Sequence, residues 1–147
     1  MNPPVSGCEL CETDGGKLVF RHAHWRVIQC DEAGFPAFYR VVWNAHRAEF
    51  SDLDDAERGA CMAAVAVVEQ VLREVLRPTK INLAALGNMV PHLHWHVIAR
   101  FDWDSHFPAP VWAAAQRVAP ASELARVAAA CEDVNRRIVE RMAGLAA

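Results

Sequence analysis

The sequence predicts an α+β domain built on an antiparallel sheet of about five strands, with one long helix and a C-terminal helix. Two observations carry this prediction. Short runs rich in aromatic and β-branched residues alternate with turn residues, which is typical of strands joined by hairpins. Two longer segments repeat apolar residues every three or four positions, the spacing of an amphipathic helix. We expect residues 1–147 to form this single domain, with residues 1–16 as an N-terminal lead-in.

The strands are predicted from their β-branched and aromatic content and from the turn residues between them. Phe38-Tyr-Arg-Val-Val-Trp43 is the clearest of them, and Gly87-Asn-Met separates the last two. The expected strands cover residues 18–21, 25–30, 38–43, 80–86 and 92–100.

The long helix is predicted over residues 53–77. Ser51-Asp-Leu-Asp54 supplies a start resembling a capping box, with acidic residues in the first turn. Pro78 ends the helix because proline cannot continue the hydrogen-bond ladder. The C-terminal helix is predicted over residues 121–142, where apolar residues line one face and charged residues the other.

Composition restricts the partners and the compartment. The formal net charge is -3, which argues against binding a long nucleic acid but leaves room for a small phosphate ligand. Charged residues interrupt every apolar stretch before it reaches the length of a membrane span, so no membrane association is expected. The N-terminus lacks the features of a secretory signal, and the five cysteines are an odd number. Together these features predict a reducing, cytoplasmic setting without disulfides.

The stretch Pro91-His-Leu-His-Trp-His-Val-Ile98 is the most informative part of the sequence. In a strand, alternate side chains share a face, so His92, His94 and His96 would stand in a row about 7 Å apart. A half-exposed strand would not ordinarily use histidine on its polar face. Such a row could bind a metal, although two ligands are the usual limit for residues on one flat strand. Alternatively, a neutral imidazole can attack phosphorus while its neighbours contact phosphate oxygens or a leaving group.

Residues 92–98 match the pattern His-φ-His-φ-His-φ-φ, where φ is apolar, and the chain thereby resembles the histidine triad (HIT) superfamily. The order of strands, long helix, strand, turn and triad strand is also similar. The resemblance favours the branch of nucleoside phosphoramidate hydrolases and dinucleoside polyphosphate hydrolases, such as diadenosine polyphosphate hydrolases. It implies hydrolysis of a nucleotidyl bond at the α-phosphorus through a covalent nucleotidyl-histidine intermediate. It also implies a homodimer.

The resemblance further implies roles for single residues. His94 would attack the phosphorus, His96 would contact the phosphate or leaving group, and His92 would orient the site or bind metal. Four further residues would contact the substrate: Asn82, Gly87, Asn88 and Asp31. On a simpler interpretation, Asn82 would only satisfy a strand end, and Asn88 and Asp31 would only form turns.

Three positions depart from the family pattern. Relatives often carry Ser or Gln five residues before the nucleophile, where this chain has Met89, which has no hydrogen bond to offer. Asn88 would substitute for it. Asn82 lies one residue closer to the triad than the family's asparagine, and Asp31 matches the family's ribose-binding acid only if one gap is allowed. The departure at Met89 affects leaving-group preference, not the nucleophile.

A structural zinc site is also expected. Cys8-Glu-Leu-Cys11 has the spacing that lets both thiolates bind one tetrahedral ion. Some bacterial HIT proteins resemble this chain in tying such a pair to two histidines, here His46 and His92. An empty reduced pair and a redox-active pair are the alternatives.

Three other functions remain open at this point. They are a nucleotidyl transferase, a non-catalytic module that binds nucleotide or zinc, and a metalloenzyme that uses the triad as ligands.

Overall fold

The chain forms one five-stranded antiparallel sheet, as the sequence predicts, with strand order β1-β2-β3-β5-β4. The computed structural model describes residues 3–145, so residues 1–2 of the predicted lead-in lie outside the described residues. The strands are β1 (Lys17–Arg21), β2 (Trp25–Gln29), β3 (Phe38–Trp43), β4 (Lys80–Ala84) and β5 (His94–Arg100).

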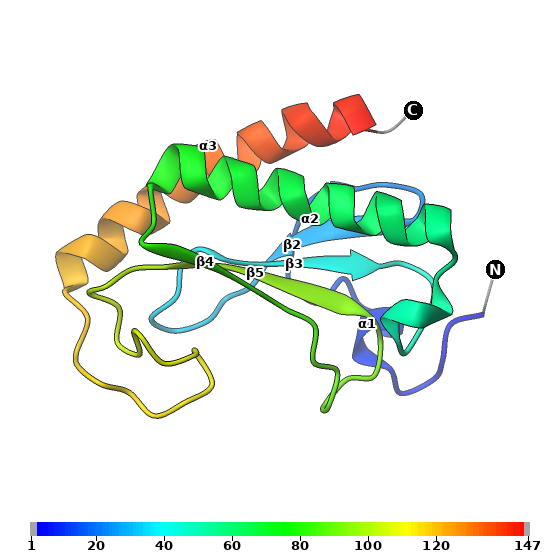
Figure 1. Cartoon of the computed structure of the whole chain (residues 1–147), viewed down its shortest axis with the longest axis horizontal. Coiled ribbons are helices and arrows are strands. Elements are labelled where there is room, and N and C mark those ends of the chain that lie inside the picture. Colours follow the sequence, from blue (N-terminus) through cyan, green and yellow to red (C-terminus); the bar gives the residue numbers. More distant parts are fainter. Residues whose placement is uncertain (1–2, 146–147) are drawn as a thin grey trace.

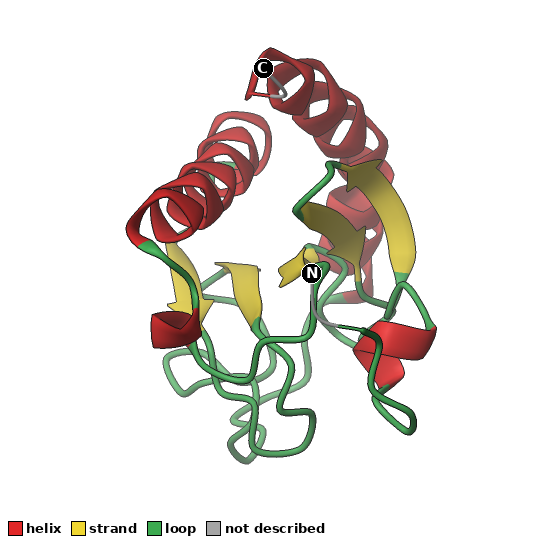
Figure 2. Ribbon diagram, turned by 90° about the vertical axis from the view of Figure 1, so that its right-hand side faces the viewer, coloured by secondary structure: helices red, strands yellow, loops and turns green. Residues whose placement is uncertain are grey.

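Both long helices lie on the same face of the sheet. Helix α2 (Asp55–Leu76) and helix α3 (Ala121–Leu145) run above the strands in Figure 1, and Figure 2 shows the connecting loops gathered on the opposite side. The two helices also contact each other. The fold is therefore the predicted α+β architecture, with one helical layer and one sheet. No helix within residues 3–145 is both long and apolar enough to cross a membrane.

The start and end of α2 follow from its flanking residues. Asp54 is the N-cap, and its side chain accepts a hydrogen bond from the Glu57 amide while the Glu57 carboxylate accepts one from the Asp54 amide. This reciprocal pair satisfies two amides that a helix start leaves without partners. A short 3-10 turn, η1 (Phe50–Asp52), precedes it. At the other end Arg77 adopts a left-handed conformation directly before Pro78.

The core lies between the sheet and the helices. Alternate residues of each strand point toward the helices, among them Val27, Val41 and Val97, each with no exposed surface. Helices α2 and α3 contribute apolar residues at helical spacing, which include Leu72 and Ile138. Because one face of the sheet is used for this packing, the other face is free to carry polar side chains.

The N-terminal segment packs firmly against that other face. It contains a short helix, α1 (Glu9–Glu12), and Leu10 is buried. Arg26 on β2 is also buried and donates hydrogen bonds to the carbonyl oxygens of Leu10, Thr13 and Asp14 at 2.7, 3.1 and 3.0 Å. The segment thus has more contacts than its predicted character as a lead-in suggested.

Candidate active site

His94 and His96 lie side by side on β5, on the face of the sheet away from the helices. Strand β5 begins at His94, two residues later than predicted, so His92 is outside the strand pairing. The rings of His94 and His96 have centroids 5.0 Å apart and are nearly perpendicular. Both side chains are buried, with 8% and 4% of their surface exposed.

Hydrogen bonding fixes the orientation of His94. Its Nδ1 lies 2.6 Å from the carbonyl oxygen of His92, and because a carbonyl only accepts, Nδ1 carries the proton. The neutral ring then has its lone pair on Nε2. Burial lowers the pKa of His94, and the charge of Arg40 acts in the same direction, while the hydrogen bond to the His92 carbonyl opposes both. The imidazole is therefore kept in its neutral, nucleophilic form.

A cavity of about 430 Å³ opens beside these two histidines. Its wall combines β3 and β5 with the β4–β5 turn and with the N-terminal segment. A cavity of this size is in the range of small-molecule sites. The lining residues are Glu9, Leu10, Arg40, Leu86, Gly87, Asn88, Met89, Val90, His94, His96 and Trp112.

Arg40 is a functional candidate that the sequence analysis missed. It lies opposite His96 in the β3–β5 pairing, and its Nε donates a hydrogen bond to His96 Nδ1 at 3.3 Å. Burial lowers the pKa of His96 to about 3, with the charges of Arg40 and His94 contributing. The available signal was an arginine in the centre of an otherwise apolar strand, at a position that shares a face with Phe38 and Val42.

The predicted substrate residues separate into two groups. Gly87 and Asn88 line the cavity with the histidines, and Gly87 has a φ of 80°, a conformation that favours glycine. Asn82 instead accepts a hydrogen bond from Arg100 Nη1 at 2.8 Å. Asp31 lines a different cavity, of about 570 Å³, near the start of α3. Of the four predicted contacts, the structure brings two beside His94.

Met89 also lines the cavity, and 93% of its surface is exposed. Its thioether can accept only a weak hydrogen bond and can donate none. The turn therefore supplies backbone groups and the Asn88 amide at this edge of the cavity, but no hydroxyl donor at position 89.

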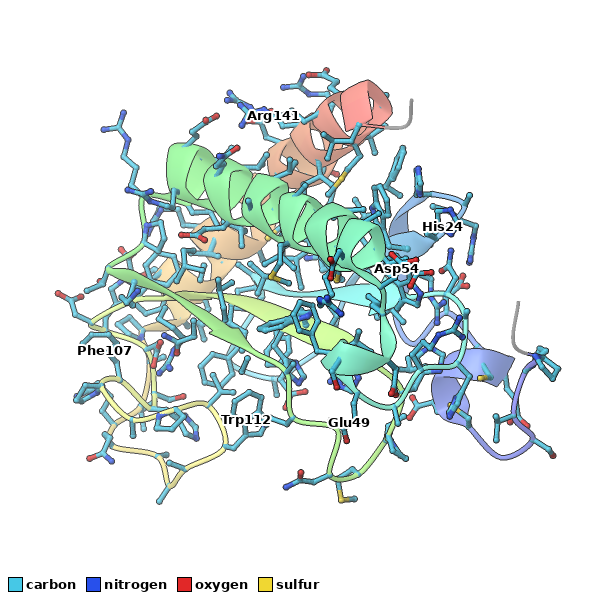
Figure 3. The ribbon with its side chains drawn as sticks, turned by 45° about the vertical axis from the view of Figure 1, so that its right-hand side comes forward. His24, Glu49, Asp54, Phe107, Trp112 and Arg141 are labelled. Atoms are coloured by element: carbon cyan, nitrogen blue, oxygen red, sulfur yellow. The ribbon has the colours of Figure 1, made fainter. Side chains whose placement is uncertain are left out.

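Trp112 covers the cavity from the long loop that follows β5. Its ring centroid is 5.0 Å from that of His96, and half of its surface is exposed. Figure 3 shows it below the sheet, on the side opposite Arg141 of α3. The loop is anchored by the buried ion pair of Arg100 Nε with Asp104 Oδ2 at 2.8 Å.

Cys8, Cys11, His46 and His92 form a second cluster, and it could bind a metal ion such as zinc. One donor atom from each residue lies within 4.8 Å of all the others. The Nδ1 of His92 is 3.5 and 3.4 Å from the two sulfurs, and the Nδ1 of His46 is 3.3 Å from Cys11 Sγ. Zinc bonded tetrahedrally at ordinary lengths separates sulfur and nitrogen ligands by about 3.6 Å. The four residues therefore fit such an ion.

A backbone contact supports the ligand geometry of His92. Its Nε2 lies 2.6 Å from the Trp43 carbonyl oxygen and donates to it, which leaves Nδ1 free of a proton and directed at the sulfurs. All five cysteines, within the residues that the structure describes, are free thiols.

The chain is similar to solved bacterial histidine triad proteins. One from Bradyrhizobium japonicum is 31% identical, with a TM-score of 0.68 and coverage of 85% of this chain and 92% of that one. A protein from Sinorhizobium meliloti 1021 is 27% identical, with a TM-score of 0.64 and coverage of 82% of this chain and 90% of that one. A protein from Marinobacter aquaeolei VT8 shares the fold at 23% identity, with a TM-score of 0.67 and coverage of 86% and 93%.

Among curated proteins, none matches this chain. The HIT domain family matches residues 14–103, from the turn before β1 to the loop after β5. That segment is more than half of the chain and contains His46, all of α2 and the three histidines of the triad. The chain therefore belongs to the HIT domain family.

Proposed function

We propose that this protein is a nucleotide hydrolase that cleaves a nucleotidyl bond through a covalent intermediate on His94. The observation that carries the proposal is the hydrogen bond from His94 Nδ1 to the His92 carbonyl beside a cavity of nucleotide-accommodating size. It leaves the Nε2 lone pair available for attack on phosphorus. Membership of the HIT family supports the same chemistry.

The reaction has two steps. In the first, His94 Nε2 forms a bond to the α-phosphorus, and the leaving group departs with the electrons of its former bond to phosphorus. The imidazole gains positive charge in this step, and the His92 carbonyl stabilises that charge through Nδ1–H. In the second step, water attacks phosphorus and the bond between phosphorus and His94 Nε2 breaks, with its electron pair returning to Nε2. The nucleoside monophosphate leaves, the proton lost by the water passes to solvent, and neutral His94 is restored.

Backbone and side-chain groups around the cavity would hold the substrate. Gly87 and Asn88 lie where the chain can approach a phosphate closely, since a glycine at positive φ leaves the backbone unobstructed. Trp112 offers an aromatic edge and face for a base. His96 adjoins the nucleophile and contacts the phosphate or the leaving group.

A metal at the Cys8, Cys11, His46 and His92 cluster would serve structure. Four protein donors complete a tetrahedral shell and leave no position for substrate. His92 would be held by the ion through its side chain, while its carbonyl orients His94. The cluster would thus fix both the N-terminal segment and the position of the nucleophile.

The test is to trap the intermediate. Purified protein is mixed with a dinucleoside polyphosphate or a nucleoside phosphoramidate, quenched within one turnover and analysed by peptide mass spectrometry for a nucleotidyl group on His94. His94→Ala should lower the turnover rate at least about 10³-fold, as loss of a covalent nucleophile does. His24→Ala is the matched control, because His24 is an exposed histidine away from this cavity (Figure 3). Undiminished turnover by His94→Ala would refute the proposal.

A further inference from the structure

We propose that Arg40 is the polyphosphate-binding residue of this cavity and that it selects substrates whose leaving group is a phosphate anion. The inference rests on the proposed hydrolase function and specifies its substrate class. It is drawn from three features of the site: the free donors of Arg40, the charges around it and the weak acidity of the histidine beside the leaving group.

The first feature is the hydrogen-bonding state of Arg40. Its guanidinium has five N–H donors, and the Nε donor is used by His96 at 3.3 Å. Across residues 3–145 no acceptor contacts its Nη1 or Nη2 groups. The guanidinium carbon, Cζ, lies over the Phe38 ring, 5.7 Å from the ring centroid. The side chain is half-buried and lines the cavity. Four donors of this side chain, which lines the cavity, thus have no protein acceptor within hydrogen-bond distance. They form the fork arrangement that matches phosphate oxygens.

The second feature is the distribution of charge. Two other arginines of this sheet face are already satisfied: Arg100 pairs with Asp104, and Arg26 is bound by carbonyl oxygens of the N-terminal segment. Among the described residues that line the cavity, Arg40 is the one cation and Glu9 is the one acid. Glu9 is exposed, so water screens its charge more strongly than that of half-buried Arg40. The deeper part of the cavity therefore attracts anions.

The third feature concerns the leaving group. An amine leaving from phosphorus needs a proton, whereas a phosphate leaves as a stable anion. His96 is the adjacent imidazole, but Arg40 occupies its Nδ1, and burial with the Arg40 charge lowers its pKa to about 3. Met89 offers no donor. Because His96 Nδ1 accepts from Arg40, the neutral ring carries its proton on Nε2, which is a much weaker acid than an imidazolium. The site consequently provides positive charge for a departing phosphate and only a weak acid for a departing amine.

The experiment compares two substrates with the same adenylyl group and different leaving groups. Diadenosine tetraphosphate releases a nucleotide anion, and adenosine phosphoramidate releases an amine. The variants are Arg40→Gln, which keeps an amide donor for His96, and Arg40→Met, which keeps most of the stem. Arg73→Gln on the exposed side of α2 is the control, because it changes the net charge equally and lies away from the cavity.

We expect both Arg40 variants to lose about 10- to 150-fold in kcat/KM for the tetraphosphate, the range for loss of charged hydrogen bonds. The phosphoramidate should change by less than about threefold, and Arg73→Gln should leave both substrates within about twofold. Equal losses on the two substrates would overturn the inference, since Arg40 would then act only through His96 or on the shared α-phosphate.

A binding measurement keeps this inference separate from the proposed function. Inorganic tripolyphosphate is titrated by calorimetry into the wild type, Arg40→Gln and Arg73→Gln. We expect a loss of about 10-fold or more in affinity for Arg40→Gln alone. If the wild type turns over neither nucleotide, the hydrolase proposal fails, but selective loss of tripolyphosphate binding still supports the role of Arg40. Unchanged affinity in Arg40→Gln would refute that role.

Discussion

Asp104→Ala tests how firmly the loop that carries Trp112 is attached to the sheet. Asp104 and Arg100 are 2% and 1% exposed. The carboxylate accepts hydrogen bonds from Arg100 Nε and Nη2 at 2.8 and 3.1 Å. It also accepts from the backbone amides of Phe101, His106 and Phe107 at 3.2, 3.0 and 2.7 Å. One side chain therefore satisfies both a buried cation and three amides of the loop.

Truncation to alanine leaves those groups without their acceptor. Arg100 keeps two hydrogen-bond acceptors, the Asn82 side chain and the Ala109 carbonyl, and the rings of Phe35 and Phe107 beside its guanidinium. None of these groups carries a negative charge. Removing one partner of a buried ion pair costs about 3–5 kcal/mol because the remaining charge stays desolvated. We expect Asp104→Ala to lower the free energy of unfolding at neutral pH by this amount.

Urea denaturation followed by tryptophan fluorescence measures the effect. Asp102→Ala is the matched control, because Asp102 is exposed two residues away, and it should change stability by no more than about 0.5 kcal/mol. A loss below about 1 kcal/mol for Asp104→Ala would refute the reasoning, since the pair would then contribute no more than an exposed one.

The same pair gives a pH dependence with a defined sign. Burial raises the pKa of Asp104, but hydrogen bonds from Arg100 and from loop amides, with the Arg100 charge, outweigh it and hold the pKa below its usual value. A carboxyl whose pKa is lower in the folded state stabilises that state above the unfolded pKa and ceases to do so as pH falls through the folded value. The difference in the free energy of unfolding between wild type and Asp104→Ala should therefore have its full value at neutral pH and decrease below about pH 4.

Two further predictions concern the Cys8, Cys11, His46 and His92 cluster and the side chain of Trp112. Cys11→Ser should reduce bound zinc, measured by elemental analysis, from about one ion per chain to near none, because it removes one of four ligands. The control variant Cys30→Ser should retain the ion. Equal zinc in both variants would contradict this assignment. Trp112→Ala should weaken nucleotide binding about 5- to 150-fold in a calorimetric titration, because it removes one contact between a base and an aromatic ring. Val118→Ala, at an exposed position, should leave the affinity unchanged. Unchanged affinity in Trp112→Ala would show that Trp112 only packs against His96.

Much of the fold was predictable because local signals and tertiary packing agree. The run from Phe38 to Trp43 was predicted residue for residue, since its β-branched and aromatic content matches a central strand. Asp54 and Pro78 likewise restricted α2, and the observed helix differs from the prediction by two residues at the start and one at the end. Periodicity and capping are local properties, so one sequence is enough to identify them.

The site was less predictable because it depends on contacts between distant segments. The histidine pattern located β5, but the strand pairing begins only at His94. The contact of His92 with Cys8 and Cys11, more than 80 residues earlier in the chain, was expected only from the family resemblance. Asn82 has a partner in Arg100 that no spacing rule indicates. Arg40 was overlooked for the same reason. Its contact with His96 depends on the register of β3 against β5, which the sequence does not show.

The residues that stabilise the fold and the residues that line the cavity lie largely on opposite sides of the sheet. Its helix-facing side holds the largest apolar cluster, and the residues around His94 come from the opposite side and from the loops below it (Figure 2). The exposed positions of two of these loops, Leu86 and Met89 in one and Trp112 in the other, can therefore accept substitutions at little cost to folding. Such a division makes this protein a favourable starting point for laboratory evolution. Libraries confined to those two loops should yield altered substrate ranges among variants that still fold.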